Sequence, residues 1–176
     1  NGTFNVLIVT NGGYLSHGLD AVIGGGAGAV SNAAVVGGSG AKWNLNSRKL
    51  TVGAAGATNN VLRILTGGIV TNGGTVQIGS GSTTVSNSLI MDGGCLSASS
   101  LSLSTVSNGV TFNSGWMDLR SATVNNGLAF TVGDGTGVGT LTAADAAGTL
   151  TFNNGLVIAR NSWLLGVGSI SGATTI

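Results

Sequence analysis

The chain is 176 residues long, the size of a single domain, and its composition is unusual. Only 6% of the residues are charged, all five acids are Asp, and there are 33 Gly residues but no Pro. Helical surfaces are normally built from Glu, Lys and Arg, so this composition argues against a helical bundle or an α/β enzyme. A formal net charge of +1 excludes disorder driven by charge repulsion, and Gly without a three-residue period excludes collagen.

An internal repeat organises the chain, because an Asn recurs immediately before a short apolar run. In chain order the runs are NVLIV from Asn5, NAAVV from Asn32, NVLRI from Asn60, NSLIM from Asn87, NGVTF from Asn108, NGLAF from Asn126 and NGLVI from Asn154. The second and fourth residues after each Asn are apolar, which is the alternation of a β-strand and not the period of a helix. These positions predict an inward-facing core stripe of Leu7, Val9, Ala34, Val36, Leu62, Ile64, Leu89, Met91, Val110, Phe112, Leu128, Phe130, Leu156 and Ile158.

Most of these predicted strands are followed by a turn signal and then by further apolar residues. Turn residues stand at 11–13, 37–40, 67–68, 92–94 and 113–115. Large apolar residues come next, at Tyr14, Trp43, Ile69, Leu96, Trp116 and Trp163. A third apolar patch follows in several units, at 50–52, 76–78 and 101–103. A long unit therefore consists of three short strands separated by turns.

Units of this kind predict an all-β chain folded as a β-solenoid (parallel β-helix) of about seven coils. The anchor Asn residues are 18 to 28 positions apart, and so short a unit cannot bury its own apolar face. Stacked coils bury it, with Gly at the corners and a ladder of Asn side chains along the seven anchors. Residues 1–176 are expected to form one solenoid domain without a capping helix, of either handedness. The alternative is a β-sandwich with Gly-rich turns.

The spacing of the anchors also predicts how copies of the chain would follow one another. A second copy placed directly after the first would put its first anchor at position 181, which is 27 residues after Asn154 and equals the long-unit spacing. We therefore expect the coils to continue across the chain ends, either in tandem copies or through non-covalent head-to-tail contacts between uncapped terminal coils.

One outward-facing column is unusually apolar for a solvated surface. The third residue after each Asn should point away from the core. Arg63, Thr111 and Ala129 occupy three of these seven positions, and the other four are large and aliphatic. These four predict a covered face that makes lateral contacts with a neighbour: Ile8, Val35, Ile90 and Val157.

The stretch from Gly133 to Gly172 resembles the passenger-associated repeats of bacterial autotransporters. Those repeats use the pattern G-D-G-T, then L-T-F-x-N-G-L, then L-x-G-x-G-x-I-x-G. The matching residues are 133–136, 150–152, 154–156, Leu164, Gly166, Gly168, Ile170 and Gly172. The resemblance implies a secreted β-solenoid stalk or fibre at a bacterial surface, and it brings no catalytic residue with it.

No catalytic, cofactor-binding or metal-binding site is predicted. Asp92 and Asp118 come from different units that stacking could align, but Asp92 belongs to a DGG turn, where Asp is a turn former. His17 is the single His and is expected in a surface loop, which leaves no Ser–His–Asp set or His pair for a metal. Cys95 is the single Cys and is expected to be a small buried hydrophobe.

Neither a nucleic-acid partner nor membrane insertion by this segment is predicted. A small basic group lies beside Trp43 and consists of Lys42, Arg48 and Lys49. This group is expected to belong to a solvated loop. No apolar run reaches the roughly 18 residues that a membrane-spanning helix needs.

The sequence therefore predicts a structural subunit of an extracellular bacterial fibre or surface stalk that stacks on itself. Two alternatives remain: an adhesin segment that binds a host or a polysaccharide, and a polysaccharide-degrading enzyme on a β-helix. A charge in the core stripe, as in Leu128→Asp or Leu156→Asp, is expected to abolish assembly.

Overall fold

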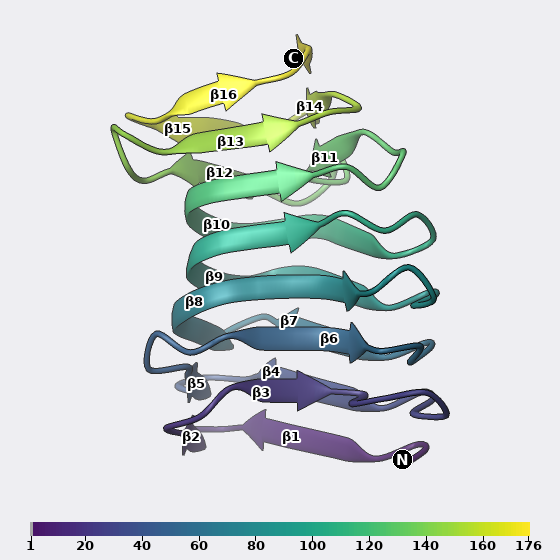
Figure 1. The fold of residues 1–176 in the computed structure, drawn as a ribbon. Helices are drawn as coiled ribbons and strands as arrows, with labels where there is room; N and C mark the ends of the chain where they lie inside the picture. Colours follow the sequence, from purple (N-terminus) through teal and green to yellow (C-terminus); the bar gives the residue numbers. More distant parts are fainter. Residues whose placement is uncertain (1) are drawn as a thin grey trace.

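The computed structural model describes residues 2–176 as a right-handed parallel β-solenoid of about six turns. The strands on the near side of Figure 1 run to the right while the chain climbs from the N to the C terminus, which defines the handedness. Seventeen strands and no helix occur within this range, so the predicted fold class is confirmed. The second and third faces have seven levels and the first face has an eighth strand, so the predicted seven coils are close to the observed number.

Each turn of the solenoid has three faces, and the strands pair in parallel with their equivalents on neighbouring levels, except between β10 and β11, where the first face divides into two sheets. The first face follows the Asn anchors and contains β1 (Val6–Thr10), β4 (Ala33–Gly37), β7 (Val61–Leu65), the first parts of β9 (Ser88–Leu103) and β10 (Gly109–Val124), then β11 (Phe130–Val132), β14 (Leu156–Ile158) and β17 (Thr174–Thr175).

The second and third faces are built in the same way. The second face contains β2 (Tyr14–Ser16), β5 (Lys42–Asn44), the start of β8 (Ile69–Ser80), the middle of β9 and β10, β12 (Gly139–Ala143) and β15 (Trp163–Gly166). The third face contains β3 (Ala21–Ile23), β6 (Leu50–Ala54), the ends of β8, β9 and β10, β13 (Thr149–Phe152) and β16 (Ser169–Ser171). β8, β9 and β10 bend around corners without a break, as Figure 1 shows.

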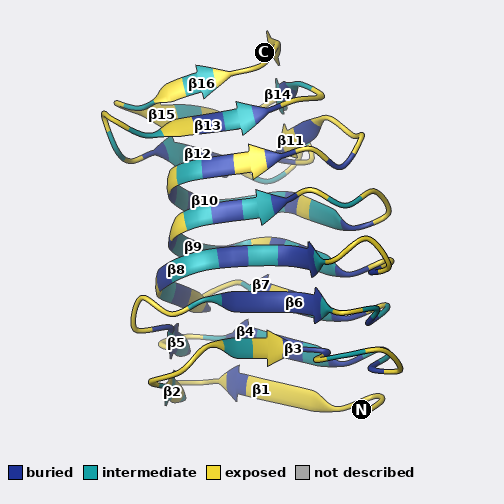
Figure 2. Cartoon of the chain, viewed as in Figure 1, coloured by how far each residue is buried: buried dark blue, intermediate teal, exposed yellow. Residues whose placement is uncertain are grey.

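The core is a column of aliphatic and aromatic side chains on the axis of the solenoid. Alternate residues of every strand point inward, which is the direct result of the two-residue period. Figure 2 shows burial concentrated on the middle levels and exposure at both ends. On the first face the buried column contains Val9, Val36, Ile64, Met91, Phe112, Val132 and Ile158.

The corner before the first face has a fixed backbone geometry at five successive levels. The residue preceding each of the first five anchors has a left-handed backbone, with φ between 56° and 69° at Phe4, Ser31, Asn59, Ser86 and Ser107. Asn tolerates this region well, which fits Asn59, and the other four positions are three Ser and one Phe. Gly is required where the corner touches the anchors: a Cβ on Gly53 would overlap the amide of Asn87.

Coil six is offset from the pattern that the anchors predict. The N–H of Gly133 donates to the carbonyl of Phe112 at 2.8 Å, which places Val132 above Phe112 and Phe130 above Val110. The sixth anchor, Asn126, therefore precedes its strand by two residues more than the earlier anchors do. Coils of unequal length fit on one axis because the additional residues are accommodated in the corner loops.

Candidate functional site

Five of the anchor Asn residues form a continuous hydrogen-bonded column at one corner of the solenoid. In the lower four, both the backbone N–H and Nδ2 donate to Oδ1 of the Asn one level above, at 2.9–3.1 Å. At Asn60 the second Nδ2 proton reaches the carbonyl of Ala29, 3.2 Å away on the level below. The members of this Asn ladder are Asn5, Asn32, Asn60, Asn87 and Asn108, of which all but Asn5 are buried.

The predicted ladder of seven is wrong at its last two positions. Asn126 is buried but donates from Nδ2 to the backbone carbonyl of Asn108 at 2.9 Å, so it covers the top of the column instead of extending it. Asn154 is exposed, and its Oδ1 accepts a bond from the N–H of Gly127 at 3.1 Å. The two-residue offset of coil six moves Asn126 out of register and places Leu128 at the level between Asn108 and Asn154, so the column stops before Asn154.

The same offset corrects one predicted core residue. Leu128 is 65% exposed. Phe130 takes the inward position predicted for Leu128, and Val132 takes the inward position predicted for Phe130. Leu7 is 41% exposed because it lies on the first level, and Val110 is half-buried against the core. The other predicted core residues are buried: Val9, Ala34, Val36, Leu62, Ile64, Leu89, Met91, Phe112, Phe130, Leu156 and Ile158.

The predicted lateral contact residues lie in one outward column, but polar residues interrupt it. Ile8 pairs with Val35, Val35 with Arg63, Arg63 with Ile90 and Ile90 with Thr111. Higher up, Thr131 and not Ala129 lies beneath Val157. The column therefore presents separated apolar residues and no continuous apolar strip.

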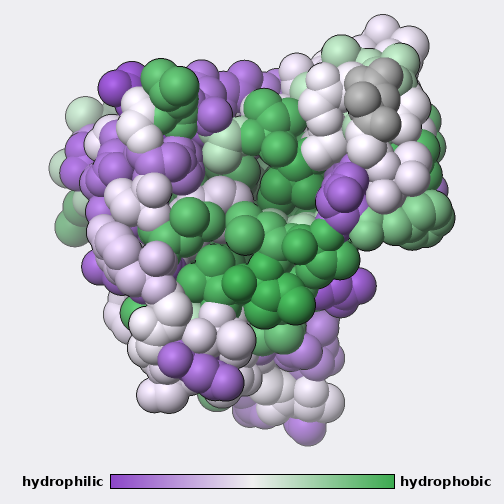
Figure 3. Space-filling view, turned by 90° about the horizontal axis from the view of Figure 1, so that it is seen from below, coloured by the Kyte–Doolittle hydropathy of each residue, from purple (hydrophilic) through white to green (hydrophobic). Residues whose placement is uncertain are grey.

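The first level exposes the interior of the solenoid at its N-terminal end. Among the described residues, β1, β2 and β3 each have a strand partner on one side alone. A hollow of about 540 Å³ opens between them, with Leu7, Ile23 and Trp43 among its lining residues. Figure 3 shows this end with hydrophobic side chains gathered at its centre and polar ones around them. No described residue donates to Oδ1 of Asn5, the lowest member of the Asn ladder.

The C-terminal end is open in the same sense but begins an eighth level. Within the described chain β15, β16 and β17 pair on one side alone, and the core-facing Leu164 and Ile170 are only partly buried. β17 stacks Thr174 on Leu156, which is a spacing of 18 residues. The predicted tandem register is therefore wrong: Gly172, and not position 181, stands one level above Asn154. A directly fused second copy would enter one face out of step.

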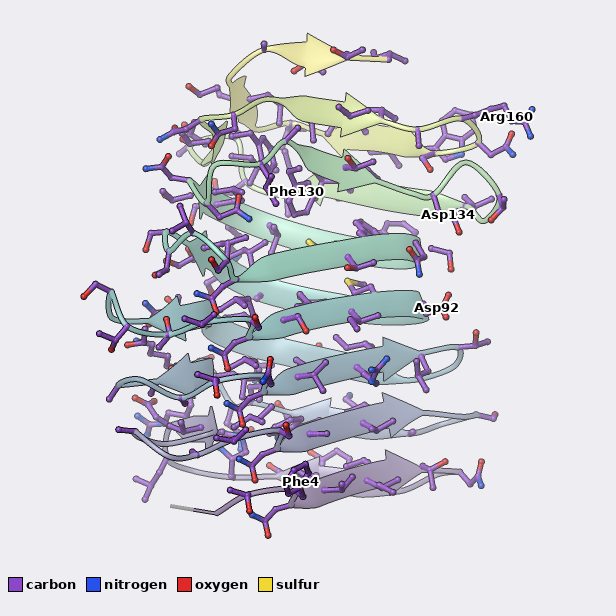
Figure 4. The ribbon with its side chains drawn as sticks, turned by 90° about the vertical axis from the view of Figure 1, so that its right-hand side faces the viewer. Phe4, Asp92, Phe130, Asp134 and Arg160 are labelled. Carbon is purple, nitrogen blue, oxygen red and sulfur yellow. The ribbon has the colours of Figure 1, made fainter. Side chains whose placement is uncertain are left out.

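The acidic residues are not paired. Asp92 lies where the first face ends and registers with Ser114, whereas Asp118 lies in the second face and registers with Ser97. Figure 4 shows Asp92, Asp134 and Arg160 projecting from one edge of the solenoid at different levels. No group of three or more His, Cys and Asp side chains within residues 2–176 could hold a metal ion.

Asp134 organises the GDGT corner of coil six. Its Oδ1 accepts bonds from the Thr136 hydroxyl at 2.7 Å and from the N–H groups of Thr136 and Gly137 at 2.8 and 2.9 Å. These donors, the hydroxyl first, lower the pKa of Asp134 to about 2. The carboxylate therefore stabilises its own turn, which is a structural role.

His17, the basic residues and Cys95 do not converge on a common site, although His17 Nε2 and Trp43 Nε1 are buried without a hydrogen-bond partner among the described residues. His17 packs edge-on against Trp43, with ring centroids 5.9 Å apart, and its Nδ1 lies 2.6 Å from the carbonyl of Leu19. Arg48 is exposed at the corner between the second and third faces, and Lys42 lies half-buried in β5. Cys95 is half-buried and faces outward, so the expectation of a buried thiol is wrong.

Two outward surfaces were missed by sequence reasoning. The second face carries a column of Tyr14, Lys42, Ile69, Cys95, Trp116, Thr140 and Trp163. The third face carries a pair of outward polar side chains on each of five levels, and all but one of these ten side chains are hydroxyls. The pairs are Thr75 and Gln77, Ser100 and Ser102, Ser121 and Thr123, Thr149 and Thr151, and Ser169 and Ser171. The short S/T-x-S/T motifs could have indicated the hydroxyl pairs of the third face, but the unequal coil lengths hide their alignment in the sequence.

A scan against protein-family models found no match for this chain, and searches of curated proteins and of solved structures found none either. Residues 2–176 contain no helix with the length and hydropathy that crossing a membrane requires.

Proposed function

We propose that this chain is a structural segment of an extracellular bacterial fibre or surface stalk, and that its end levels are continued by the strands of a second copy. The observation that carries the proposal is the state of the two end levels. Each presents three strand edges without a partner among the described residues, next to core side chains that are exposed at the N-terminal end and partly buried at the C-terminal end. An edge of this kind is a template for further β-pairing.

Backbone geometry at β1 supports continuation downward. The N–H of Ala33 donates to the carbonyl of Asn5 at 2.9 Å, which fixes the alternation of the parallel ladder. Leu7 and Val9 therefore turn their backbone groups toward β4, whereas Val6 and Ile8 turn theirs toward the open edge. A strand docked beneath β1 would satisfy these groups and would cover the exposed side chain of Leu7.

The Asn ladder supports the same direction of growth. Each Oδ1 from Asn32 to Asn108 accepts two bonds from the level below, whereas Oδ1 of Asn5 receives none from the described residues. A new level beneath Asn5 could supply those donors. The heterologous contact between two different ends does not close on itself, so it leads to open-ended growth.

The extracellular location rests on the resemblance of residues 133–172 to autotransporter repeats. The enzyme alternative has little support, because Asp92 and Asp118 lie on different faces and Asp134 is engaged in its own turn. The adhesin alternative is favoured by one specific observation, the exposed aromatic ring of Trp116 on the second face.

The test is assembly of the purified chain, followed by sedimentation velocity and negative-stain electron microscopy over a range of concentrations. We expect rods that lengthen with concentration. Ile8→Pro removes the N–H that faces the open edge and places a ring there, so it should leave a folded monomer that does not assemble. Ile8→Val keeps the N–H and the β-branched side chain, and should assemble as the parent chain does.

Two results would overturn the proposal. One is a parent chain that stays monomeric at every concentration at which it is soluble. The other is normal rods from Ile8→Pro, since growth would then not involve the edge of β1.

A further inference from the structure

The indole of Trp116 is exposed in the middle of the solenoid. Its side chain is 48% exposed on the second face, although β10 is paired with β9 below and with β12 above. The exposure is therefore not a consequence of lying in an end level, unlike that of Trp163. A large aromatic ring left open at an interior level is typical of a binding surface.

Trp116 forms one wall of a hollow of about 250 Å³ on this face. The hollow spans three levels, because Ile69 registers with Cys95 and Cys95 with Trp116. Its outward-facing lining consists of an apolar row, Ile69, Cys95 and Trp116, and a polar row, Thr71, Ser97 and Asp118. An apolar flat side thus lies directly beside hydroxyl and carboxylate groups.

A second hollow of about 310 Å³ adjoins the first toward the corner with the third face. The two share Ser97 and Asp118, so together they form one trough across the middle levels. Asn72, Ser99 and Arg120 line the corner half, which makes that half strongly polar. The combined size is within the roughly 300–1,000 Å³ of ligand pockets.

The chemistry of the trough matches a sugar better than other ligands. A pyranose ring has an apolar face of C–H groups and a rim of hydroxyls that both donate and accept hydrogen bonds. The trough offers an aromatic plane for the first and a carboxylate, a guanidinium and hydroxyls for the second. Asp118 and Arg120 carry opposite charges, so the lining favours a neutral ligand over a polyanion.

We propose that this trough binds a neutral saccharide of at least two units. One pyranose ring stacks on the indole of Trp116, and the hydroxyls of the next ring bond to Asp118 and Arg120. Ser97 donates to Oδ2 of Asp118 at 3.4 Å, which orients the carboxylate and leaves Oδ1 for the ligand. The site goes beyond the structural role proposed above and is independent of it, because the trough lies away from both end levels.

The first experiment titrates the full chain with neutral hexasaccharides, cellohexaose, chitohexaose and maltohexaose, and with polygalacturonate as the acidic comparison. We expect at least one neutral hexasaccharide to bind and polygalacturonate not to. Trp116→Ala should weaken that binding by about tenfold or more, and Asp118→Asn should weaken it while keeping the shape of the side chain. Trp163→Ala is the matched control, because Trp163 stands in the same column but lines neither hollow.

The native chain provides a second measurement that needs no substitution. Cys95 is the single Cys and lines the apolar half of the trough, so bound saccharide should slow its alkylation. Burial, and then the charge of Asp118, raise the pKa of the thiol, so alkylation should be followed at alkaline pH. Failure of all three hexasaccharides to bind or to protect Cys95 would overturn the proposal. So would equal losses from Trp116→Ala and Trp163→Ala.

Discussion

The corner Asn is the residue on which the middle of the solenoid depends. Asn60 has no solvent exposure, and its amide accepts two bonds from Asn32 while donating to Ala29 and Asn87. A buried amide is tolerated because every one of its hydrogen-bonding positions is used. Substitution with any residue of similar size but fewer polar atoms would leave groups on two levels without partners.

We predict that Asn60→Ala lowers the free energy of unfolding by about 3 kcal/mol, because the N–H and Nδ2 of Asn32 lose their acceptor in a buried corner. Asn154→Ala is the control: it removes the same side chain from an exposed position and should change stability by less than about 1 kcal/mol. Urea unfolding of the monomeric Ile8→Pro background measures both. Equal losses at the two positions would contradict the ladder as the source of stability.

At the scale of the strand, the repeat in the sequence and the repeat in the structure do not always coincide. The same run of Asn, Gly, Leu, apolar residue, large apolar residue occurs at 126–130 and 154–158. Leu128 nevertheless points into solvent, whereas Leu156 is fully buried, because β11 begins two residues later than the run predicts. Hydrogen bonding to the level below, and not local pattern, decides which residue of a run starts the strand.

Substitution with Asp should therefore have opposite outcomes at two residues that occupy the same place in the repeat. Leu156→Asp puts an unpaired charge in the core and should cost about 4 kcal/mol or more, enough to prevent stable folding. Leu128→Asp changes an exposed corner and should cost less than about 1 kcal/mol. Circular dichroism and urea unfolding distinguish the two. A severe loss from Leu128→Asp would mean that coil six follows the sequence repeat after all.

The three faces of the whole molecule differ in outward chemistry although they share one core. The first presents separated aliphatic residues, the second a mixed column that contains three aromatic residues and the trough, and the third mainly paired hydroxyls. Because few residues are charged, hydroxyl groups are the main side-chain groups that interact with solvent on the third face. This division leaves the two ends as the places where backbone groups and core are open together.

β17 occupies the place that the first strand of an incoming copy would need. It pairs with β14 on the first face, and the carbonyl of Ala173 accepts the N–H of Leu156 at 2.8 Å. Under the proposed assembly β1 of the next copy must displace it. We predict that deleting residues 173–176 lowers the critical concentration for assembly by about fivefold, since a competing contact of about 1 kcal/mol is removed.

The measurement for this prediction is the monomer concentration that remains after sedimentation of rods, compared with the parent chain. Ile8→Pro combined with the deletion is the control and should not assemble. An unchanged or higher critical concentration would mean that β17 is part of the contact and does not compete with it.

The sequence by itself determined the fold class, the direction in which most strand residues point and the first five rungs of the Asn ladder. These follow from local period: alternation selects strands, recurrence selects stacking, and Asn before the run marks the corner. Leu62, Ile64, Leu89 and Met91 are buried as the alternation predicts. Composition contributed the absence of helix, because the residues that build helical surfaces are scarce.

Only the tertiary structure decided which levels lie opposite one another, and hence the surfaces. Register between coils is set by backbone bonds to the level below, and corner loops absorb differences of up to ten residues in coil length. For this reason the displacement of Asn126 and Leu128, the alignment of hydroxyls on the third face and the meeting of Trp116 with Asp118 in one trough are absent from any local pattern. The local sequence determines where a strand forms, and stacking between coils determines which residues lie next to it.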